Sequence, residues 1–530
     1  MTARSAMESA RALVTALQRP DAYPHAVDVP IRVAETHISW VLLTGEYAYK
    51  LKKPIKLSFL DYSTLERRHQ LCEEELRLNR RLAPALYLGL SVVGGPPERP
   101  RLDGGGPALE YAVRMRQFSP ADELENLLAA ADVTEGDVAA LGAGIARFHA
   151  AAAPAPEESD YGRPETVHRV TMDNFAELRG LPESREWSTN LSALEARLAA
   201  LQRELRPHMD ERRRHGRVRE CHGDLHCGNV VRWKTVLTPF DGIEFDPALR
   251  FIDVVNDVAF LTMDLAERSH SPLRRAGLQA WVETSGDWSA LPLLPYYEAY
   301  RALVRAKVDA LRALQLDAGS AARATAIADC RRYLDWAAAR VTPRRPVLLV
   351  TCGLSGSGKT WVARRLAARL GALHLRSDVE RKRLAGLAAH EDSHSPPDAG
   401  IYTLEFNEHT YQRLLECAAA SLACGEPTIV DAAFLRRHER QSFLALAGER
   451  AVPFAIVHCR APDAILRERV RARSAARSDA SEAGLDVLAR QPSYWEDFCS
   501  EESPRVVAVD TSDPPAIAAA IEGLARLAGG

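Results

Sequence analysis

An eight-residue segment, residues 353–360, limits what this chain can fold into more than any other feature. It reads Gly-Leu-Ser-Gly-Ser-Gly-Lys-Thr and follows the apolar run Val-Leu-Leu-Val-Thr-Cys. This spacing is a P-loop pattern, in which backbone N–H groups between a strand and a helix surround phosphate oxygens. A helix is predicted over 359–370, so the context fits, and the alternative is a chance glycine-rich turn. The residues expected to bind nucleotide phosphates are Gly353, Leu354, Ser355, Gly356, Ser357, Gly358, Lys359 and Thr360, with Thr360 also holding Mg²⁺.

Length and composition exclude several classes of protein. A chain of 530 residues is too long for a single hydrophobic core. The net charge of −3 gives no general attraction to nucleic acid or to an anionic membrane. Nine cysteines without a Cys-x-x-Cys pair argue against a zinc ribbon. The N-terminus lacks an apolar signal core, and no run of about 18 uncharged apolar residues is present, so we expect a cytoplasmic protein without a membrane segment.

Two domains are predicted from the order of the elements. Residues 1–340 read as a small sheet-rich lobe followed by a larger helical lobe, which predicts an α+β bilobal fold. It includes a hairpin at Thr44-Gly45, a helix over about 64–83 and a long helical pattern over about 293–340. Residues 341–346, Val-Thr-Pro-Arg-Arg-Pro, suit an exposed linker. In residues 347–530 strands and helices alternate, which predicts an α/β domain with a parallel sheet.

Two carboxylates in the C-terminal domain follow predicted strands. Asp431 ends the run Pro-Thr-Ile-Val, where it is placed to meet Mg²⁺ or its water. The alternative is that it caps the next helix. Asp378 follows the strand Ala-Leu-His-Leu-Arg-Ser and is placed to accept a proton from a substrate hydroxyl, although it also suits a helix cap. Arg381 lies one helical turn further on and is a candidate for holding the acceptor.

An arginine-rich segment follows in residues 466–481. Arg469 and Arg473 are four residues apart, so a helix would place them on one face. A lid with arginines can close on the phosphates being transferred, and the alternative is a solvated basic face. The arginines of this segment are Arg467, Arg469, Arg471, Arg473 and Arg477.

Residues 345–530 resemble a group of P-loop kinases that includes polynucleotide kinase, zeta-toxin-like and gluconate-kinase-like proteins, an AAA-type kinase group. The resemblance rests on the P-loop and on the runs SDVERKRL, IVDAAF and RVRARSAARSDAS. It implies that Asp378 is the general base and that Arg469 and Arg473 belong to a lid over ATP.

A second phosphate-handling motif lies at residues 222–229, His-Gly-Asp-Leu-His-Cys-Gly-Asn. Asp224 is placed to take a hydroxyl proton, and Asn229 and Asp241 are placed to hold Mg²⁺. The order Asp, Asn, Asp is the one by which protein kinases hold metal-bridged phosphates. The alternative is a hairpin with acidic turns.

The N-terminal lobe should supply a lysine and a glutamate. Lys50 and Lys52 lie on the same face of a predicted strand, and we favour Lys50. Helical spacing places Glu75 on the inward stripe with Leu71, Leu78 and Leu82. An inward Glu75 opposite Lys50 would position ATP phosphates, and the alternative is that these charges face solvent.

Residues 35–310 resemble the aminoglycoside phosphotransferase and choline-kinase-like family. The resemblance rests on CHGDLHCGNV, FDGIEF and RFIDVVNDVAFL. It implies that Asp224 is the catalytic base, that Asn229 and Asp241 are Mg²⁺ ligands, and that Asp257 and His222 brace the loop. No GxGxxG loop precedes Lys50, which departs from protein kinases.

The two motifs predict a bifunctional ATP- and Mg²⁺-dependent kinase, each domain acting on a hydroxyl of a small molecule. One alternative is a nucleotide-sensing protein in which one domain controls the other. Another is an ATPase or polynucleotide-type kinase activity in the C-terminal domain, although little outside the lid is basic enough to favour nucleic acid. The sequence identifies neither acceptor nor oligomeric state.

Overall fold

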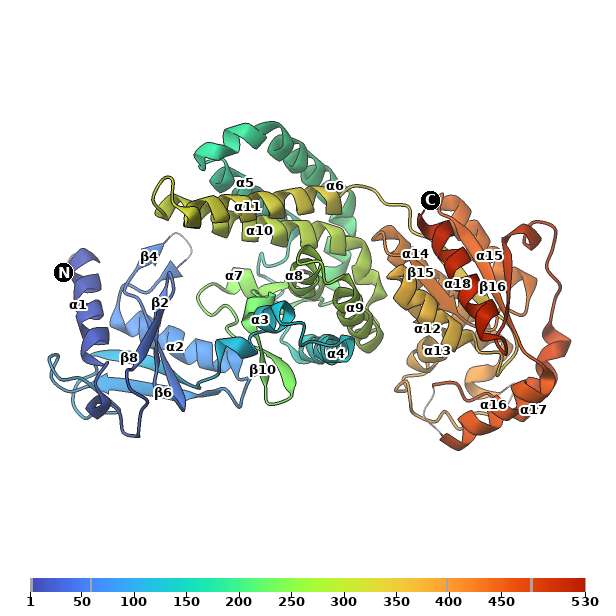
Figure 1. The fold of residues 1–530 in the computed structure, drawn as a ribbon, viewed down its shortest axis with the longest axis horizontal. Coiled ribbons are helices and arrows are strands. Elements are labelled where there is room, and N and C mark those ends of the chain that lie inside the picture. The colour runs from blue at the N-terminus through green and yellow to red at the C-terminus, as the bar shows by residue number, and fades with distance from the viewer. Residues whose placement is uncertain (1–2, 58–59, 397–398, 477–479, 530) are drawn as a thin grey trace. The chain divides into compact units, whose positions relative to one another are not determined.

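The computed structural model describes residues 3–529 apart from 58–59, 397–398 and 477–479 (Figure 1). Contacts group the chain into two compact units. The first unit is Met1–Asp173 with Arg206–Leu265, and the second is Asn174–Leu205 with Ala266–Gly530. The segment 341–346 lies inside the second unit, so helices that precede it pack with the P-loop part of the chain. The domain boundary at 341–346 stays a prediction.

The first unit is built on an antiparallel sheet. In the part of the chain that the structure describes, this sheet has six strands in the order β1-β2-β3-β8-β6-β7. The strands of this unit are β1 (Arg32–Glu35), β2 (Ser39–Leu43), β3 (Tyr47–Lys52), β4 (Lys56–Leu57), β5 (Leu60–Asp61), β6 (Tyr87–Gly94), β7 (Arg101–Leu102), β8 (Glu110–Arg116), β9 (Val218–Glu220), β10 (Val230–Trp233), β11 (Val236–Pro239) and β12 (Phe251–Asp253).

Helices of the first unit cover this sheet and build a second lobe. The predicted helix over 64–83 is observed as α2, which begins after Thr64, whose side chain accepts a hydrogen bond from Arg67 N at 3.2 Å, and ends at Asn79. The helices that lie wholly in this unit are α1 (Ala3–Ala16), α2 (Leu65–Asn79), α3 (Leu124–Ala129), α4 (Glu135–Ala151) and α7 (Pro247–Arg250). Three helices are divided between the two units, namely α5 (Pro164–Leu178), α6 (Ser188–Arg214) and α8 (Val254–Glu267).

The side chains of strand β3 alternate between the two faces of the N-terminal sheet. Tyr49 and Leu51 point into an apolar cluster with residues of α1. Ala48 points to the opposite face, into a cluster with Cys72 and Leu76 of α2. Because side chains alternate along a strand, Lys50 shares the face of Ala48 and is directed towards α2.

The helical pattern over 293–340 is two helices rather than one. α10 (Leu294–Gln315) is followed by the cap residue Leu316. α11 (Ala321–Arg340) begins after Ser320, whose hydroxyl accepts a hydrogen bond from Arg323 N at 3.2 Å. Gly319 has a φ of +89°, which other residues rarely adopt. The turn at Gly319 and the serine cap therefore break the helix.

The predicted parallel α/β sheet is confirmed in the second unit. Within the described residues, its strand order is β14-β15-β13-β16-β17 and all pairs are parallel. The strands are β13 (Leu348–Cys352), β14 (Leu373–Arg376), β15 (Thr428–Asp431), β16 (Phe454–Arg460) and β17 (Val506–Asp510). The helices are α9 (Ser271–Ser285), α12 (Lys359–Leu370), α13 (Ser377–Leu384), α14 (Leu404–Ala423), α15 (Arg437–Glu449), α16 (Asp463–Ala476), α17 (Leu485–Arg490) and α18 (Pro514–Gly529), besides α10 and α11.

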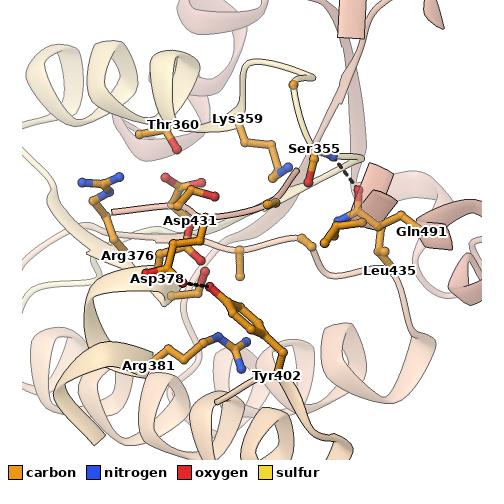
Figure 2. A pocket seen from close by; sticks show the side chains of 18 of the residues that line it. Ser355, Lys359, Thr360, Arg376, Asp378, Arg381, Tyr402, Asp431, Leu435 and Gln491 are labelled. Carbon is orange, nitrogen blue, oxygen red and sulfur yellow. Dashed lines mark hydrogen bonds between the residues drawn. The ribbon is translucent and has the colours of Figure 1, made fainter. Parts of the chain in front are cut away.

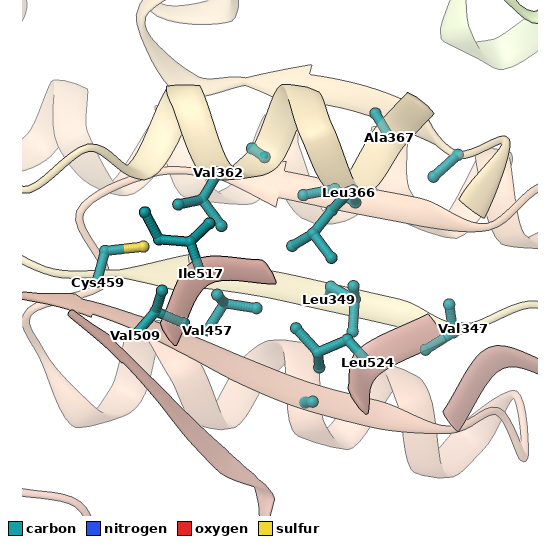
Figure 3. Close-up of a cluster of buried hydrophobic side chains, with 14 residues drawn as sticks. Val347, Leu349, Val362, Leu366, Ala367, Val457, Cys459, Val509, Ile517 and Leu524 are labelled. Atoms are coloured by element: carbon teal, nitrogen blue, oxygen red, sulfur yellow. The ribbon is translucent and has the colours of Figure 1, made fainter. Parts of the chain in front are cut away.

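The core of the P-loop part lies between the sheet and two helices (Figure 3). Leu349 and Val457 project from neighbouring strands and meet Leu366 of α12 and Leu524 of α18. All five residues of β13 are buried. A strand buried along its whole length is covered on both faces, as expected for a central parallel strand.

Register brings the candidate residues to one edge of this sheet. Val350 pairs with Val430, so the loops after β13 and β15 leave the sheet side by side. Arg376, the last residue of β14, pairs with Asp431, the last residue of β15. Ligands of open α/β sheets bind beyond the carboxyl ends of the strands.

No helix in the described part of the chain combines the length and apolar character needed to cross a membrane.

Truncation of the core should destabilise the P-loop part. Leu366→Ala should lower the free energy of unfolding by about 2–5 kcal/mol, because it leaves a cavity among packed side chains. Denaturant unfolding followed by fluorescence measures this. The matched control is Leu527→Ala, at a position 41% exposed on α18, which should change stability by less than about 0.5 kcal/mol. Equal effects of the two substitutions would contradict the assignment of the core.

Candidate functional site

The P-loop has the backbone that its glycines require. Gly353, Gly356 and Gly358 have φ values of +142°, +81° and +83°. A Cβ at Gly353 would lie 2.4 Å from the carbonyl oxygen of Cys459, and one at Gly356 would lie 2.6 Å from that of Leu466. Side chains at these positions are excluded by space as well as by conformation.

The P-loop lysine contacts its own loop. Lys359 Nζ donates to the carbonyl oxygens of Gly353 and Leu354, each at 2.8 Å. Burial lowers the pKa of this ammonium group. The Ser355 N–H donates to Gln491 Oε1 at 2.7 Å (Figure 2). Nucleotide phosphates would offer the loop stronger, charged acceptors than these carbonyl and amide oxygens.

Asp431 lies beside the P-loop at the end of β15, as predicted. Its carboxylate lies 3.1 Å from His374 Nε2 and accepts from Thr351 Oγ1 at 3.2 Å. Burial acts to raise the pKa of Asp431, but hydrogen bonds from His374 and Thr360, with the charge of Lys359, lower it to about 2. With this pKa, the Asp431 carboxylate is ionised at neutral pH and lies next to Thr360. The alternative that it caps a helix is wrong, because α15 is capped at Arg436.

Asp378 lies in the first turn of α13 and lines the same cavity as the P-loop (Figure 2). The cap of α13 is Arg376, so the alternative reading of Asp378 as the cap residue is wrong. One turn on, Arg381 is 7% exposed and donates to Ile401 O at 2.9 Å and Asn407 Oδ1 at 2.7 Å. Its Nε has no hydrogen-bond partner among the described residues.

The cavity that joins these groups has a volume of about 580 Å³. Both the P-loop residues Lys359 and Thr360 and the acceptor-side residues Asp378 and Arg381 line it, which brings the four predicted residues to one site. Its lining is rich in basic side chains, as suits phosphate groups. These are Lys359, Arg364, Arg376, Arg381, Arg436, Arg469, Arg473 and Arg490.

The two arginines predicted for a lid lie on α16 and line this cavity. Arg469 donates to Gly356 O at 3.3 Å and to Thr511 Oγ1 at 2.8 Å, so it braces the P-loop. Arg473 donates to Ala483 O at 2.6 Å. Arg477 lies outside the described residues. A lid role for Arg469 and Arg473 stays a prediction.

In the first unit, Lys50 and Glu75 meet as the strand and helix patterns predicted. Lys50 Nζ lies 2.9 Å from Glu75 Oε1 and also pairs with Asp241. Burial disfavours the charge of Lys50, but Asp241 and Glu75 raise its pKa well above the ordinary value. Burial also acts to raise the pKa of Glu75, and Lys50 and Lys52 outweigh it and lower the value to about 2. The pair is an ion pair at every physiological pH.

Asp224 and Asn229 lie together on the loop between β9 and β10. Asn229 Nδ2 donates to Asp224 Oδ2 at 2.9 Å, which leaves the amide oxygen of Asn229 to bind a cation. Asp241 carries a φ of +61°, a strained conformation for a residue with a side chain. The structure thus places Lys50, Glu75, Asp224, Asn229 and Asp241 in the first unit.

The brace under this loop is Asp257 of α8. Its two carboxylate oxygens accept from Gly223 N at 2.9 Å and from His222 N at 3.1 Å. His149 Nε2 lies 3.0 Å from the same carboxylate. His149, Cys221 and Asp257 lie close enough to share a cation, but Asp257 is already occupied by these hydrogen bonds, so the cluster is structural.

Sequence reasoning missed the second lysine pair and one histidine. Lys52 is buried against Glu244 and Glu75, with its Nζ 2.6 Å from Glu75 Oε2. Glu244 follows Asp241 by three residues, and an acidic residue in an apolar run was the available signal. The only sequence signal for His374 was a polar residue within an apolar strand. Its contact with Asp431 could not be predicted, because it depends on β14 lying next to β15 in the sheet.

Mg²⁺ fits the donors of both sites. Thr360 and Asp431 in one, and Asn229 and Asp241 in the other, supply hydroxyl, amide and carboxylate oxygens, which are the ligands that Mg²⁺ prefers. The donor set would not suit a soft metal.

Comparison with known proteins gives a family match in the C-terminal part of the chain. A family model described as an AAA domain matches residues 348–497. The matched residues include the P-loop and four strands of the parallel sheet. An uncharacterised protein of Mycobacterium tuberculosis (strain H37Rv) is 29% identical over 476 residues, covering 90% of this chain and 93% of that protein.

Two solved structures illustrate the two parts. A gluconokinase from Sinorhizobium meliloti is 26% identical, covers 35% of this chain and 96% of its own, and has a TM-score of 0.26. A choline/ethanolamine kinase family protein from Mesorhizobium loti is 13% identical, covers 63% of this chain and 99% of its own, and has a TM-score of 0.36. The predicted α/β P-loop domain with a parallel sheet is confirmed, and the N-terminal part combines a sheet with helices, as the predicted α+β class requires.

Loss of the Glu75 charge should make the protein less stable in a pH-dependent way. A carboxyl pKa of about 2 in the fold, against 4.5 ordinarily, corresponds to about 3 kcal/mol of stability at neutral pH. Because the folded pKa is the lower one, this stability is present above pH 4.5 and declines as the pH falls towards 2. Glu75→Gln should therefore cost most at pH 7 and progressively less below pH 4.5.

Chemical denaturation at a series of pH values measures this difference. Glu73→Gln is the matched control, because Glu73 lies on the same helix with its side chain 61% exposed. It should change stability by less than about 0.5 kcal/mol at any pH. A pH-independent cost of Glu75→Gln would contradict the ion-pair assignment.

Proposed function

We propose that the protein is a bifunctional ATP-dependent phosphotransferase with one active site in each part. The observation that carries the proposal is the single cavity in which the P-loop and Asp378 face each other. A phosphate donor and a base that can accept a hydroxyl proton are what phosphoryl transfer requires. Each acceptor would be a hydroxyl group of a small molecule.

In the P-loop site, Lys359 and the backbone N–H groups of residues 353–360 would bind the ATP phosphates. Asp378 would take the proton of the acceptor hydroxyl while the hydroxyl oxygen forms a bond to the γ-phosphorus of ATP. The bond between the γ-phosphorus and the oxygen that bridges it to the β-phosphate would break, which releases ADP. Mg²⁺ held by Thr360 and Asp431 would offset the charge of the phosphates. Arg469 and Arg473 would close on the transferred group.

The acceptor of this site would carry an anionic group near its hydroxyl. Arg381 is fixed by two hydrogen bonds and keeps a buried Nε that no described group satisfies. A buried donor without a partner is costly, and a carboxylate or phosphate of the acceptor would satisfy it. Hydroxy acids and sugar phosphates fit this description.

In the kinase-like site, Asp224 would act as base while Lys50 orients ATP phosphates and Glu75 holds the lysine. Asn229 and Asp241 would hold Mg²⁺. The acceptor of this site is a small hydroxylated molecule of unknown class.

The single-site variants Asp378→Asn and Asp224→Asn should each abolish one product. Loss of a general base lowers turnover by about 10²–10⁴-fold, while ATP binding should stay within about twofold. The measurement is mass spectrometry of phosphorylated products from a panel of neutral and anionic hydroxylated metabolites. Each variant is the control for the other, since Asp378→Asn should spare the product that Asp224→Asn removes. Wild-type protein that phosphorylates nothing in the panel would count against the proposal.

A nucleotide sensor is the second candidate, and the pairing of Lys50 with Asp241 favours it, because the pair ties the proposed ATP lysine to a proposed metal ligand. Lys359→Ala should remove ATP binding at the P-loop under either function. Lys56→Ala, at a position 71% exposed, is the matched control and should bind ATP normally. If Lys359→Ala weakens ATP binding but every product level stays at the wild-type value, the sensor is supported. Phosphorylation of a 5′-hydroxyl oligonucleotide would instead support a polynucleotide-type activity.

A further inference from the structure

Helix α9 lies against the edge of the parallel sheet within the second unit. β14 is an edge strand, so among the residues that the structure describes no strand pairs with one side of its backbone. At His374, the side chain of Gln279 of α9 takes the place of a neighbouring strand. His374 N donates to Gln279 Oε1 at 2.8 Å, and Gln279 Nε2 donates to His374 O at 2.9 Å. A side-chain amide thus imitates the peptide of an adjacent strand.

The residue that Gln279 holds is the one that holds Asp431. The ring of His374 lies 3.1 Å from the Asp431 carboxylate. Two residues further on, β14 ends, and α13 begins with Ser377 and Asp378. The backbone of β14 therefore sets the position of a proposed metal ligand through His374 and of the proposed base through the chain itself.

A second contact reaches α13. Trp288, in the 3₁₀ helix Trp288–Leu293, donates from Nε1 to Glu380 Oε1 at 3.2 Å. Glu380 is 1% exposed and also pairs with Arg383 at 3.3 Å and Arg413 at 3.2 Å. Because Glu380 follows Asp378 by two residues on the same helix, Trp288 fixes the helix that carries the base.

Buried ion pairs fasten these helices to the P-loop part. Arg274 of α9 lies 2.7 Å from Glu426 and 3.0 Å from Glu298, and Arg340 of α11 also pairs with Glu298. Glu298 is fully buried. Breaking a buried pair leaves an uncompensated charge, so the arrangement of residues 266–340 against the sheet is strongly held.

We propose that Gln279 and Trp288 are positioning residues for phosphoryl transfer at the P-loop site. Gln279 holds β14, and with it His374 and Asp431, while Trp288 holds α13 and Asp378. The proposal rests on the proposed function of that site and adds residues from helices that precede the P-loop domain. Residues 266–340 thus support the P-loop site from outside its cavity.

The test uses the full chain with Gln279→Ala, Trp288→Phe and the control Gln412→Ala. Gln412 is an exposed glutamine on α14. Its side chain donates a hydrogen bond to Glu416 at 3.1 Å and to no other described residue. Trp288→Phe keeps an aromatic ring and removes the N–H donor. The readouts are hydrogen–deuterium exchange of a peptide spanning β14, ATP binding, and kcat and KM for the ATP-dependent product of the P-loop site.

Gln279→Ala should speed amide exchange in β14 at least about tenfold, because the His374 N–H loses its acceptor. It should lower kcat about tenfold and leave ATP binding and the KM for ATP within twofold, since the P-loop is untouched. Trp288→Phe should lower kcat severalfold with unchanged exchange in β14. Gln412→Ala should match the wild type in every readout.

Several outcomes would overturn the proposal. If Gln279→Ala speeds exchange but keeps the wild-type kcat, the contact serves packing alone. If kcat and ATP binding fall together, the loss is one of general folding. Should Gln279→Ala not fold, Trp288→Phe decides, and a wild-type kcat in that variant contradicts the positioning role. A wild-type protein without any ATP-dependent product would contradict the proposed function itself, a result distinct from variants that match an active wild type.

Discussion

Burial of opposite charges in contact is the interaction on which both candidate sites depend. Glu75 lies between Lys50 and Lys52 with no exposed surface, and the buried Asp431 carboxylate interacts with the opposite charge of Lys359 in the P-loop. Each of these charges would be expensive to bury alone. Because each carboxylate and its cationic partner come from different elements, the sites exist only when these elements are in place together.

The cost of burying a charge also separates two kinds of group in the sites: carboxylates that are held by several donors, and groups that border the cavity. The carboxylates of Glu75, Asp257 and Asp431 are held by several donors, and their pKa values lie at about 2. The groups proposed to meet substrate are held less completely. Asp378 lies on the wall of a cavity, and Arg381 keeps an unsatisfied nitrogen. In the P-loop site, the firmly held Asp431 thus lines the same cavity as two groups that are available to a ligand, Asp378 and Arg381.

The sequence predicted those parts of the sites that depend on local pattern. The loop Gly353–Thr360 could be recognised because its backbone conformation requires glycines at fixed positions, and these positions can be read from the sequence. Lys50 and Glu75 followed from the periods of a strand and a helix. Contacts that depend on strand order could not be found this way, and His374 and Gln279 are the examples. Nothing in the spacing of residues 279 and 374 indicates that they meet, because only the tertiary fold makes β14 an edge strand.

Helix boundaries show the same division between local and tertiary causes. The break between α10 and α11 had a local signal in Gly319 and Ser320, although the apolar period continues across it. The grouping of residues 266–340 with the P-loop part had none, because it rests on contacts such as that of Arg274 with Glu426.

The cover that α9 gives to β14 has a consequence for the solubility of fragments. An uncovered edge strand offers its N–H and C=O groups to strands of other molecules and promotes aggregation. A fragment that begins at the proline-rich segment 341–346 would lose Gln279 from this edge and would leave Glu426 without Arg274. A fragment that keeps residues 266–340 retains both, so the smallest soluble piece containing the P-loop should begin well before the linker that the sequence suggests.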